Sequence, residues 1–258
     1  MNHLILVEGI PGSGKTTMAE KITAYYRNRD MAVDLYPEGP GQPVDLSWHA
    51  CFPIAQYQEL LKNYNAFHDE IKEVAFFDGE YTLIPFTQIQ ADDENLAKQW
   101  ELFDLYDGLM RPSAEVLLNL LCHRWQDFSE RVMQTDRRII FESAFLQANV
   151  NRLLLWDDAD TYQIINHHNQ LIRTAECLSP VLIYLSQPDI EETVRRVADE
   201  RVSPESKWID GVIAYCEKSP FGERRGLRGW KGVNRLLDHP QRNGIGNCQS
   251  ADHTAQDH

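Results

Sequence analysis

A glycine-rich segment close to the N-terminus constrains the fold more than any other part of the chain. It reads Gly9-Ile-Pro-Gly-Ser-Gly-Lys15-Thr16, and it lies between the apolar run Leu4-Ile-Leu-Val7 and a helical pattern. Glycine tolerates positive φ, so successive N–H groups can turn toward phosphate oxygens at the start of a helix. The spacing therefore predicts a phosphate-binding loop for a nucleoside triphosphate. Its expected binding residues are Gly9, Pro11, Gly12, Ser13, Gly14, Lys15, Thr16 and Thr17.

The length and charge of the chain limit the classes of function. With 258 residues it is long enough for one α/β domain, which we expect over residues 1–237, followed by a polar, loose tail over 238–258. A formal charge of −14 argues against partners such as nucleic acid or anionic membranes, because phosphate surfaces attract basic proteins. The five cysteines form no Cys-x-x-Cys pair, no apolar stretch approaches the roughly 20 residues of a membrane span, and the N-terminal strand leaves no room for a signal peptide. These features predict a cytoplasmic protein.

Apolar patterns predict alternating strands and helices around a parallel sheet. Near-continuous apolar runs are typical of strands buried on both faces, and helical spacing is typical of the helices that cover them. We expect strands at 4–7, 31–36, 137–142 and 180–185. Helices are expected after the loop, within 150–178, and from a capping box at 189–192. The aromatic-rich segment 48–134 is mostly helical in pattern, with a break at 81–86, which predicts a helical insert on the substrate side.

The C-terminal part of the chain has the weakest pattern. Residues 222–232 are basic and rich in glycine, which fits either a mobile loop over phosphates or a solvated linker. From Asp238 onward the chain is polar and contains no apolar run long enough to predict a strand.

Phosphoryl transfer requires a metal ligand and cations in addition to the phosphate-binding loop. Glu142 ends an apolar run, a position from which its carboxylate could hold Mg²⁺ together with Thr16. Arg195, Arg196 and Arg201 follow the strand at 180–185 and could close over the γ-phosphate as a lid over 189–207. An ordinary surface glutamate and a solvated helix face would explain the same residues.

A pocket for a phosphate acceptor should combine flat aromatic walls with a few amide and charged groups. Glu38 and Asp45 are candidates to orient the attacking hydroxyl, and Arg124 is a candidate for direct contact with the acceptor. The other candidates for substrate binding are Trp48, Tyr57, Phe86, Gln88, Asp104 and Trp125. Packing in a hydrophobic core is the rival explanation for each aromatic residue.

Four segments together resemble a known family. Residues 7–17 are similar to the thymidylate kinase loop with its preceding Glu-Gly, and Pro43-Val-Asp-Leu-Ser-Trp48 resembles the Glu-Pro-Val-x-x-Trp segment of deoxynucleoside kinases. Phe141-Glu142-Ser143 stands where these P-loop kinases carry Glu-Arg-Ser or Asp-Arg-Tyr, and 184–196 resembles their strand leading into an arginine lid. The resemblance implies a kinase that uses ATP and Mg²⁺, a five-stranded parallel core, and a pocket carboxylate that accepts the proton of the attacking hydroxyl. Dimers are common in these families, so a homodimer is one expectation.

The chain also departs from this family at positions that bear on the substrate. Gln42 precedes Pro43 where deoxynucleoside kinases place a glutamate, and no arginine follows Glu142. A recognisable fifth strand is absent after the lid. The acceptor therefore remains open among nucleosides, nucleotides and small natural products such as antibiotics.

The fold class that follows is α/β, with a parallel P-loop NTPase core flanked by helices, a helical substrate-binding insert and an arginine-bearing lid. The leading hypothesis for function is an ATP-dependent phosphotransferase with a small ring-bearing acceptor. In it Lys15, Glu142 and the three arginines act on the phosphates, and Glu38 or Asp45 acts on the acceptor. A nucleotide-dependent ATPase or switch without an acceptor, and a kinase relative with little activity, are the alternatives. The chain has no Asn-Lys-x-Asp motif for guanine, which favours ATP over GTP.

Overall fold

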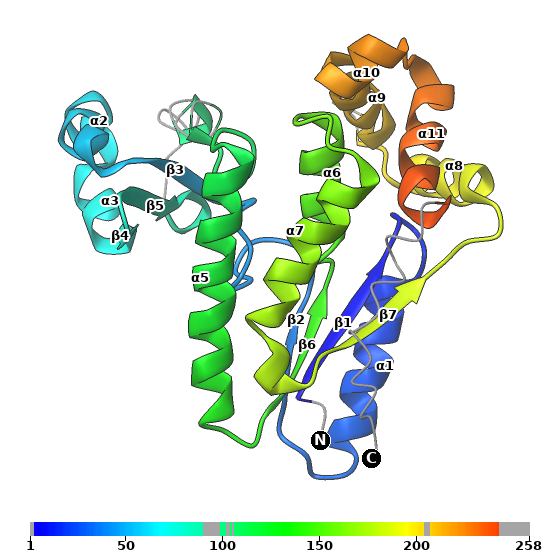
Figure 1. Ribbon diagram of the computed structural model, residues 1–258, viewed down its shortest axis with the longest axis horizontal. Helices are drawn as coiled ribbons and strands as arrows, with labels where there is room; N and C mark the ends of the chain where they lie inside the picture. The colour runs from blue at the N-terminus through cyan, green and yellow to red at the C-terminus, as the bar shows by residue number, and fades with distance from the viewer. Residues whose placement is uncertain (1–2, 90–98, 102–103, 105, 204–206, 243–258) are drawn as a thin grey trace, which may run out of the picture.

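The computed structural model describes residues 3–89, 99–101, 104, 106–203 and 207–242, and it shows an α/β fold (Figure 1). The main sheet has four parallel strands in the order β2-β6-β1-β7. Their bounds are Leu4–Gly9 for β1, Val33–Tyr36 for β2, Arg138–Glu142 for β6 and Val181–Leu185 for β7. The α/β class and the four strands predicted from the sequence are thereby confirmed.

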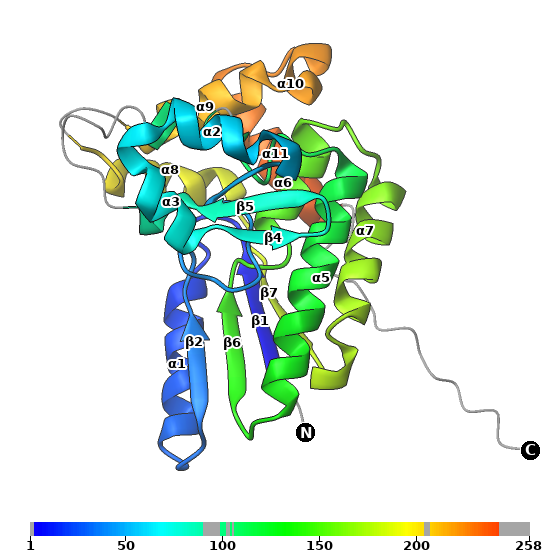
Figure 2. The ribbon, with the colours of Figure 1, turned by 90° about the vertical axis from the view of Figure 1, so that its left-hand side faces the viewer.

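Helices cover both faces of the main sheet. The α-helices whose bounds the structure gives include α1 (Lys15–Arg27), α2 (Tyr57–Asn63), α3 (His68–Val74), α5 (Ala114–Met133), α6 (Gln147–Leu155), α7 (Thr161–Arg173), α8 (Ile190–Glu200), α9 (Trp208–Lys218), α10 (Pro220–Arg225) and α11 (Gly229–Arg242). Figure 2 shows α1 on one side of the strands and α5 and α7 on the other. Helices α8 to α11 gather beyond the carboxyl end of β7 (Figure 1). The sheet edge at which the strands end is therefore enclosed by helices from the C-terminal half of the chain.

Alternating side chains on β1 explain why the sheet needs both layers. Leu4 and Leu6 belong to the large hydrophobic cluster with α5, α6 and α7, whereas Ile5 and Val7 belong to a smaller cluster with α1. Successive side chains of a strand point to opposite faces, so a strand that is apolar at every position must be covered twice. The apolar run before the glycine-rich loop thus anchors that loop at the centre of the molecule.

The segment 48–134 is less helical than its pattern predicts. It contains a three-stranded antiparallel sheet in the order β3-β5-β4, formed by His49–Pro53, Tyr81–Pro85 and Phe76–Asp78. The break expected at 81–86 is strand β5, and its partner β3 lies about thirty residues earlier in the chain, where a local periodicity gives no sign of the pairing. Helices α2 and α3 pack with this sheet around a hydrophobic cluster of their own, and α5 belongs to the main layer.

Residues 222–232 are mostly helical, so the expectation of a loop or linker was wrong. The Ser219 hydroxyl accepts a hydrogen bond from the Gly222 N–H, and Pro220 takes the first helical position. Helix α10 ends at Arg225, and the next residue is Gly226, whose φ is +60°. Glycine is favoured at such a left-handed position after a helix, and Gly229 begins α11. The glycines mark helix ends. Helix α11 also continues through 238–242, the start of the predicted loose tail, whereas 243–258 lie outside the described residues.

The described residues contain four parallel strands, one fewer than the resemblance implies. After β7 they form only helices and short connections. The sequence showed no recognisable fifth strand after the lid, and the described residues contain none there either.

Trp125 on α5 is a core residue. Its side chain is 1% exposed, and its ring lies 5.5 Å from that of Phe141 on β6 and 6.3 Å from that of Phe145, measured between centroids. A ring so enclosed packs the sheet against α5 and leaves no face for an acceptor. The expectation that Trp125 lines a substrate pocket is therefore replaced by a packing role.

We predict that Trp125→Ala lowers the free energy of unfolding by about 3–5 kcal/mol, because it leaves a large cavity between α5 and the sheet. Denaturant unfolding followed by circular dichroism measures this loss. Trp125→Phe, which retains an aromatic ring, should cost less. An alanine variant as stable as the wild type would contradict the packing role.

Candidate nucleotide-binding site

The side chain of Lys15 folds back onto the glycine-rich loop that precedes it. Its Nζ donates to the carbonyl oxygens of Gly9 at 3.0 Å and Ile10 at 3.2 Å, and to Oε1 of Gln147 at 3.0 Å. The residue is 5% exposed. Burial lowers the pKa of Lys15, while the negative charges of Glu38, Glu8 and Glu142 act to raise it. These contacts fix the ammonium at the carboxyl end of β1, where the loop turns into α1.

The first turn of α1 has the features of an anion-binding site. Its N-cap is Gly14, with φ +92°, and the first turn contains no acidic residue. Among the described residues, no side chain caps the N–H groups of this turn. Thr16 and Thr17 are exposed, and the Oγ of Ser13 is buried without a hydrogen-bond partner among the described residues. Uncapped N–H groups at the start of a helix attract anions through hydrogen bonds and the helix dipole.

Two glycines in the loop are required by close contacts. A Cβ atom on Gly12 would lie 2.2 Å from Cγ2 of Val197 on α8, and one on Gly9 would lie 2.6 Å from Oγ of Ser13. Both glycines also have positive φ, +80° and +150°. The loop is thus compact enough that helix α8 touches it directly.

Glu142 and Thr16 meet at the expected metal position. The Thr16 hydroxyl donates to Oε1 of Glu142 at 2.6 Å, and the carboxyl group is almost fully buried. The described residues contain no cluster of three or more His, Cys, Asp or Glu side chains that could hold a metal by themselves. Mg²⁺ is usually held by one or two protein oxygens together with water and phosphate oxygens, and this pair fits that pattern.

Gln42 joins the ends of β2 and β6. Its Nε2 donates to the carbonyl oxygens of Pro37 and Glu142, at 2.7 Å in both cases. The amide thereby holds the segment that carries Glu38 against the segment that carries Glu142. Gln42, where the kinases that the sequence resembles carry a glutamate, therefore has a structural role in this chain.

Of the two carboxylates predicted to orient an acceptor, only Glu38 lies beside the loop. Its Oε2 is 3.8 Å from Nζ of Lys15 and accepts from the Ser143 hydroxyl at 3.1 Å, while its Oε1 accepts from Nε2 of Gln147 at 2.8 Å. The side chain is 48% exposed, so it remains accessible. Asp45 instead accepts hydrogen bonds from the backbone and hydroxyl of Ser47. Burial raises the pKa of Asp45.

The three predicted lid arginines have different positions. Arg196 donates from Nη2 to the carbonyl oxygen of Gly12 at 3.0 Å, and Arg201 lies over the ring of Trp208 and lines a cavity beside the loop. Arg195 pairs with Glu191 on its own helix and lies over the ring of Trp230. Arg196 and Arg201 thus reach the loop, while the contacts of Arg195 are those of a helix surface.

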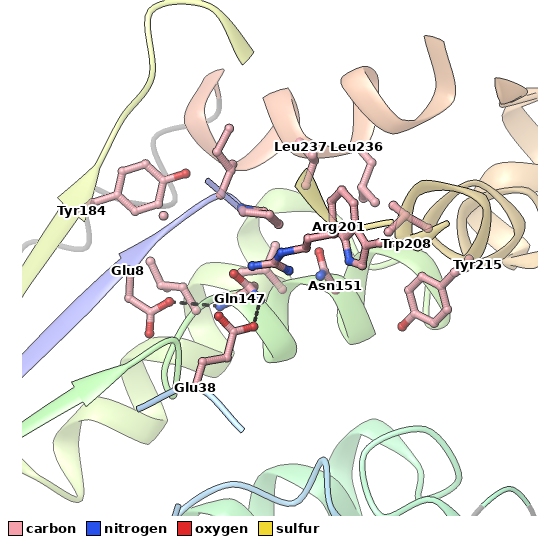
Figure 3. A pocket seen from close by; sticks show the side chains of 17 residues that line it. Glu8, Glu38, Gln147, Asn151, Tyr184, Arg201, Trp208, Tyr215, Leu236 and Leu237 are labelled. Carbon is pink, nitrogen blue, oxygen red and sulfur yellow. Dashed lines mark hydrogen bonds between the residues drawn. The ribbon is translucent and has the colours of Figure 1, made fainter. Parts of the chain in front are cut away.

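A cavity of about 420 Å³ lies beside the loop (Figure 3). Its walls come from the loop, β7, α6, α9 and α11. The residues that line it include Glu8, Glu38, Gln147, Asn151, Tyr184, Arg201, Trp208, Tyr215, Leu236 and Leu237. Pockets of this size typically hold small molecules. Except for Glu38 and Arg201, these residues were not singled out from the sequence as site residues. Most of them lie on amphipathic helices that carry no motif, and Glu8 and Tyr184 lie on the apolar strands β1 and β7.

None of the residues predicted to bind the acceptor lines this cavity; these are Trp48, Tyr57, Phe86, Gln88, Asp104, Arg124 and Trp125. Trp48 stacks on Phe86 and Tyr57 meets Phe77 edge to face, all within the insert. Gln88 and Asp104 are exposed. Arg124 lies over the ring of Phe76, and burial lowers its pKa to about 10, although the nearby Asp45 charge acts to raise it.

Glu8 is the most deeply buried charged group at the site. Its two carboxylate oxygens accept hydrogen bonds from the N–H groups of Phe145 at 2.7 Å and Gln147 at 3.2 Å, so that it caps the start of α6 from a neighbouring strand. Burial raises the pKa of Glu8 from 4.5 to about 7, and these backbone hydrogen bonds oppose the shift. The carboxyl group therefore exists in both protonation states near neutral pH.

Comparison with known sequences gives no assignment: no protein-family model matches the chain, and no curated protein shows significant similarity to it. In the described part of the chain, no helix is both long enough and apolar enough to cross a membrane. The geometry of the site is therefore the basis for a functional proposal.

Titration of Glu8 should change the stability of the protein. Because its folded pKa of about 7 exceeds its unfolded value of 4.5, its contribution is fully present below pH 4.5 and is lost as pH rises through 7. The wild type should therefore lose stability relative to Glu8→Gln, by on the order of 3 kcal/mol between pH 4.5 and 7. Denaturant unfolding of both proteins across this range measures the difference. A constant difference would contradict the raised pKa.

Proposed function

We propose that the chain is an ATP- and Mg²⁺-dependent P-loop kinase that transfers the γ-phosphate to a hydroxyl group of a small ring-bearing acceptor. The observation that carries this proposal is the position of Lys15 between two environments. Its Nζ binds the carbonyl oxygens of the glycine-rich loop on one side and contacts Gln147 and Glu38, which line the cavity, on the other. A phosphate donor in the loop and an acceptor in the cavity would meet at this ammonium.

The residues present fit both a nucleoside triphosphate and Mg²⁺. The unpaired Ser13 hydroxyl and the uncapped first turn of α1 provide donors for phosphate oxygens. Thr16 and Glu142 would hold Mg²⁺, which supplies positive charge to the phosphates. In this proposal the parallel sheet is a P-loop NTPase core, and α8, which carries Arg196 and touches Gly12, is the arginine-bearing lid.

The side chains at the site have distinct proposed roles in transfer. Lys15, Arg196 and Arg201 would balance negative charge on the transferred group, because cations fixed in a partly desolvated site stabilise charge that spreads over its oxygens. Glu38 would accept the proton of the acceptor hydroxyl, since it is accessible and already hydrogen-bonded to Gln147 and Ser143. The proposal assigns no role in phosphoryl transfer to Asp45 or Arg195.

The cavity favours a kinase over an ATPase or switch without an acceptor. A hydrolase needs room for a water molecule at the γ-phosphate, whereas this chain encloses about 420 Å³ with largely apolar walls beside Lys15.

The direct test is incubation of the protein with ATP and Mg²⁺, alone and with nucleosides, nucleoside monophosphates and hydroxyl-bearing antibiotics, followed by mass spectrometry. An acceptor that gains one phosphoryl group supports the kinase. Consumption of ATP that no acceptor changes would favour the ATPase.

Lys15→Ala should lower kcat/KM for phosphoryl transfer by at least about 100-fold, because it removes a cation preorganised for the transition state. ADP formation measured with the acceptor identified in that assay gives the change. Lys21→Ala, on the exposed surface of α1, is the matched control and should behave as wild type. Equal rates for Lys15→Ala and wild type would remove Lys15 from the reaction.

Glu38→Gln should lower kcat by roughly 100-fold or more while the Kd of ATP stays nearly constant, because the amide cannot accept a proton. Asp45→Asn is the comparison, since Asp45 was the rival carboxylate in the sequence. Turnover and calorimetric ATP binding should be measured for both variants. A larger loss of kcat in Asp45→Asn than in Glu38→Gln would assign the base to Asp45.

A further inference from the structure

The cavity has a polar end and an apolar end. Glu38 and Gln147 lie at the end next to Lys15, whereas Trp208 and Tyr215 lie at the other, with Leu236 and Leu237 nearby (Figure 3). Arg201 points from the side of Trp208 toward Gln147 and Glu38 (Figure 3). A ligand that fills this space would place a polar group beside Glu38 and an apolar or aromatic body against Trp208 and Tyr215.

The charge of the lining disfavours an anionic ligand. Arg201 is the one basic residue among the described residues that line the cavity, and Glu8 and Glu38 are acidic. A phosphate monoester carries about −1.5 to −2 charges at neutral pH and is usually bound by several cations or by a helix N-terminus. Glu8 already occupies the start of α6, because it accepts the N–H groups of Phe145 and Gln147. The described lining therefore lacks the set of cations that would bind a second phosphate group.

We propose that this cavity, built by α6, β7, α9 and α11 rather than by the insert, binds the acceptor, and that the acceptor is a neutral, hydroxyl-bearing ring compound rather than a phosphorylated one. This inference rests on the proposed kinase function and specifies its substrate class. The residues that determine substrate specificity would then lie largely on the C-terminal helices, for which the family resemblance gave no candidate substrate-binding residue.

In the proposed phosphoryl transfer, each bond that breaks is matched by one that forms. The acceptor O–H bond breaks as its oxygen forms a bond to the γ-phosphorus of ATP, and the proton passes to the Glu38 carboxylate. The bond between the γ-phosphorus and the β–γ bridging oxygen breaks, and ADP leaves with the electron pair. The products are ADP and a phosphate monoester that carries more negative charge than the acceptor. The acidic lining would then favour release of this product.

Gly211 on α9 provides a direct test of the cavity. It lines the cavity, its φ is not in the left-handed region, and an added Cβ would meet no atom within 4 Å. Gly211→Leu should therefore fill part of the space without backbone strain. Lys218→Leu is the matched control, because Lys218 is an exposed residue of the same helix and does not line the cavity. A second variant, Trp208→Ala, removes a wall of the apolar end and is compared with Trp48→Ala in the insert.

Binding is measured by calorimetry for the full chain with four nucleosides, two neutral hydroxyl-bearing antibiotics and the corresponding nucleoside monophosphates. We expect at least one neutral compound to bind about tenfold or more tightly than any monophosphate, and Gly211→Leu and Trp208→Ala to weaken that binding by at least about tenfold. Lys218→Leu should change the Kd of that compound by less than about twofold, and the Kd of ATP should stay within about twofold of the wild-type value in every variant. Tighter binding of a monophosphate, no binding of any neutral compound, or loss only in Trp48→Ala would overturn the inference.

The failure of this inference and the failure of the kinase proposal give different results. Binding that Gly211→Leu abolishes, with no phosphoryl group transferred in the presence of ATP and Mg²⁺, would retain the cavity as a ligand site and refute the kinase. Phosphoryl transfer with the same KM for the acceptor in wild type and Gly211→Leu would retain the kinase and refute the cavity as its acceptor site.

Discussion

Parallel pairing of β1 with β6 and β7 is the constraint on which the rest of the site depends. The register aligns Val7 with Glu142 and Gly9 with Leu185, so the three strands end at one edge of the sheet. Whatever follows each strand must therefore emerge at that edge. The glycine-rich loop, the Glu142 carboxylate and the start of the segment leading to α8 come together for this reason. Buried apolar side chains on both faces of β1 hold the register, since a slip by one residue would exchange the two faces.

The site concentrates charge that would be costly if any part were unpaired. Lys15, Glu8 and Glu142 are all nearly or fully buried, and each has close polar partners: carbonyl oxygens for Lys15, backbone N–H groups for Glu8 and a hydroxyl for Glu142. A buried charge without a partner destabilises a protein by several kcal/mol, so these contacts also hold the groups in place before any ligand binds. Preorganisation of this kind lowers the free energy needed to reorganise a site during a reaction. The same contacts therefore serve stability and, in the proposed kinase, catalysis.

The sequence predicted best what is specified locally. The loop between Gly9 and Thr16 and the four core strands could be found because glycine positions and continuous apolar runs are short-range signals. The antiparallel sheet of the insert could not, because the pairing of His49–Pro53 with Tyr81–Pro85 joins segments far apart in the chain. Nor could the sequence predict which of Glu38 and Asp45 lies beside the loop. In the structure Glu38 accepts a hydrogen bond from Gln147, whereas Asp45 accepts one from Ser47. The cavity was missed because helices α6, α9 and α11 meet only through tertiary packing, and leucine and tryptophan residues at helical spacing predict a core equally well.

Two positions at which the sequence differs from the kinases that it resembles lie close together in the structure. Where the resembling kinases carry an arginine after the metal carboxylate, this chain has Ser143, whose φ is +60° and whose hydroxyl donates to Glu38. Where they carry a glutamate before the proline, Gln42 bonds backbone carbonyl groups instead. Compared with those kinases, Ser143 lacks a positive charge and Gln42 lacks a negative charge. The Glu38 carboxylate between them is held by the neutral side chains of Gln147 and Ser143 and by Lys15. A carboxylate in such surroundings keeps an accessible oxygen for a hydroxyl proton. Arg201 is the one basic residue among the described residues that line the cavity, so the surroundings of Glu38 agree with the neutral acceptor inferred from the cavity.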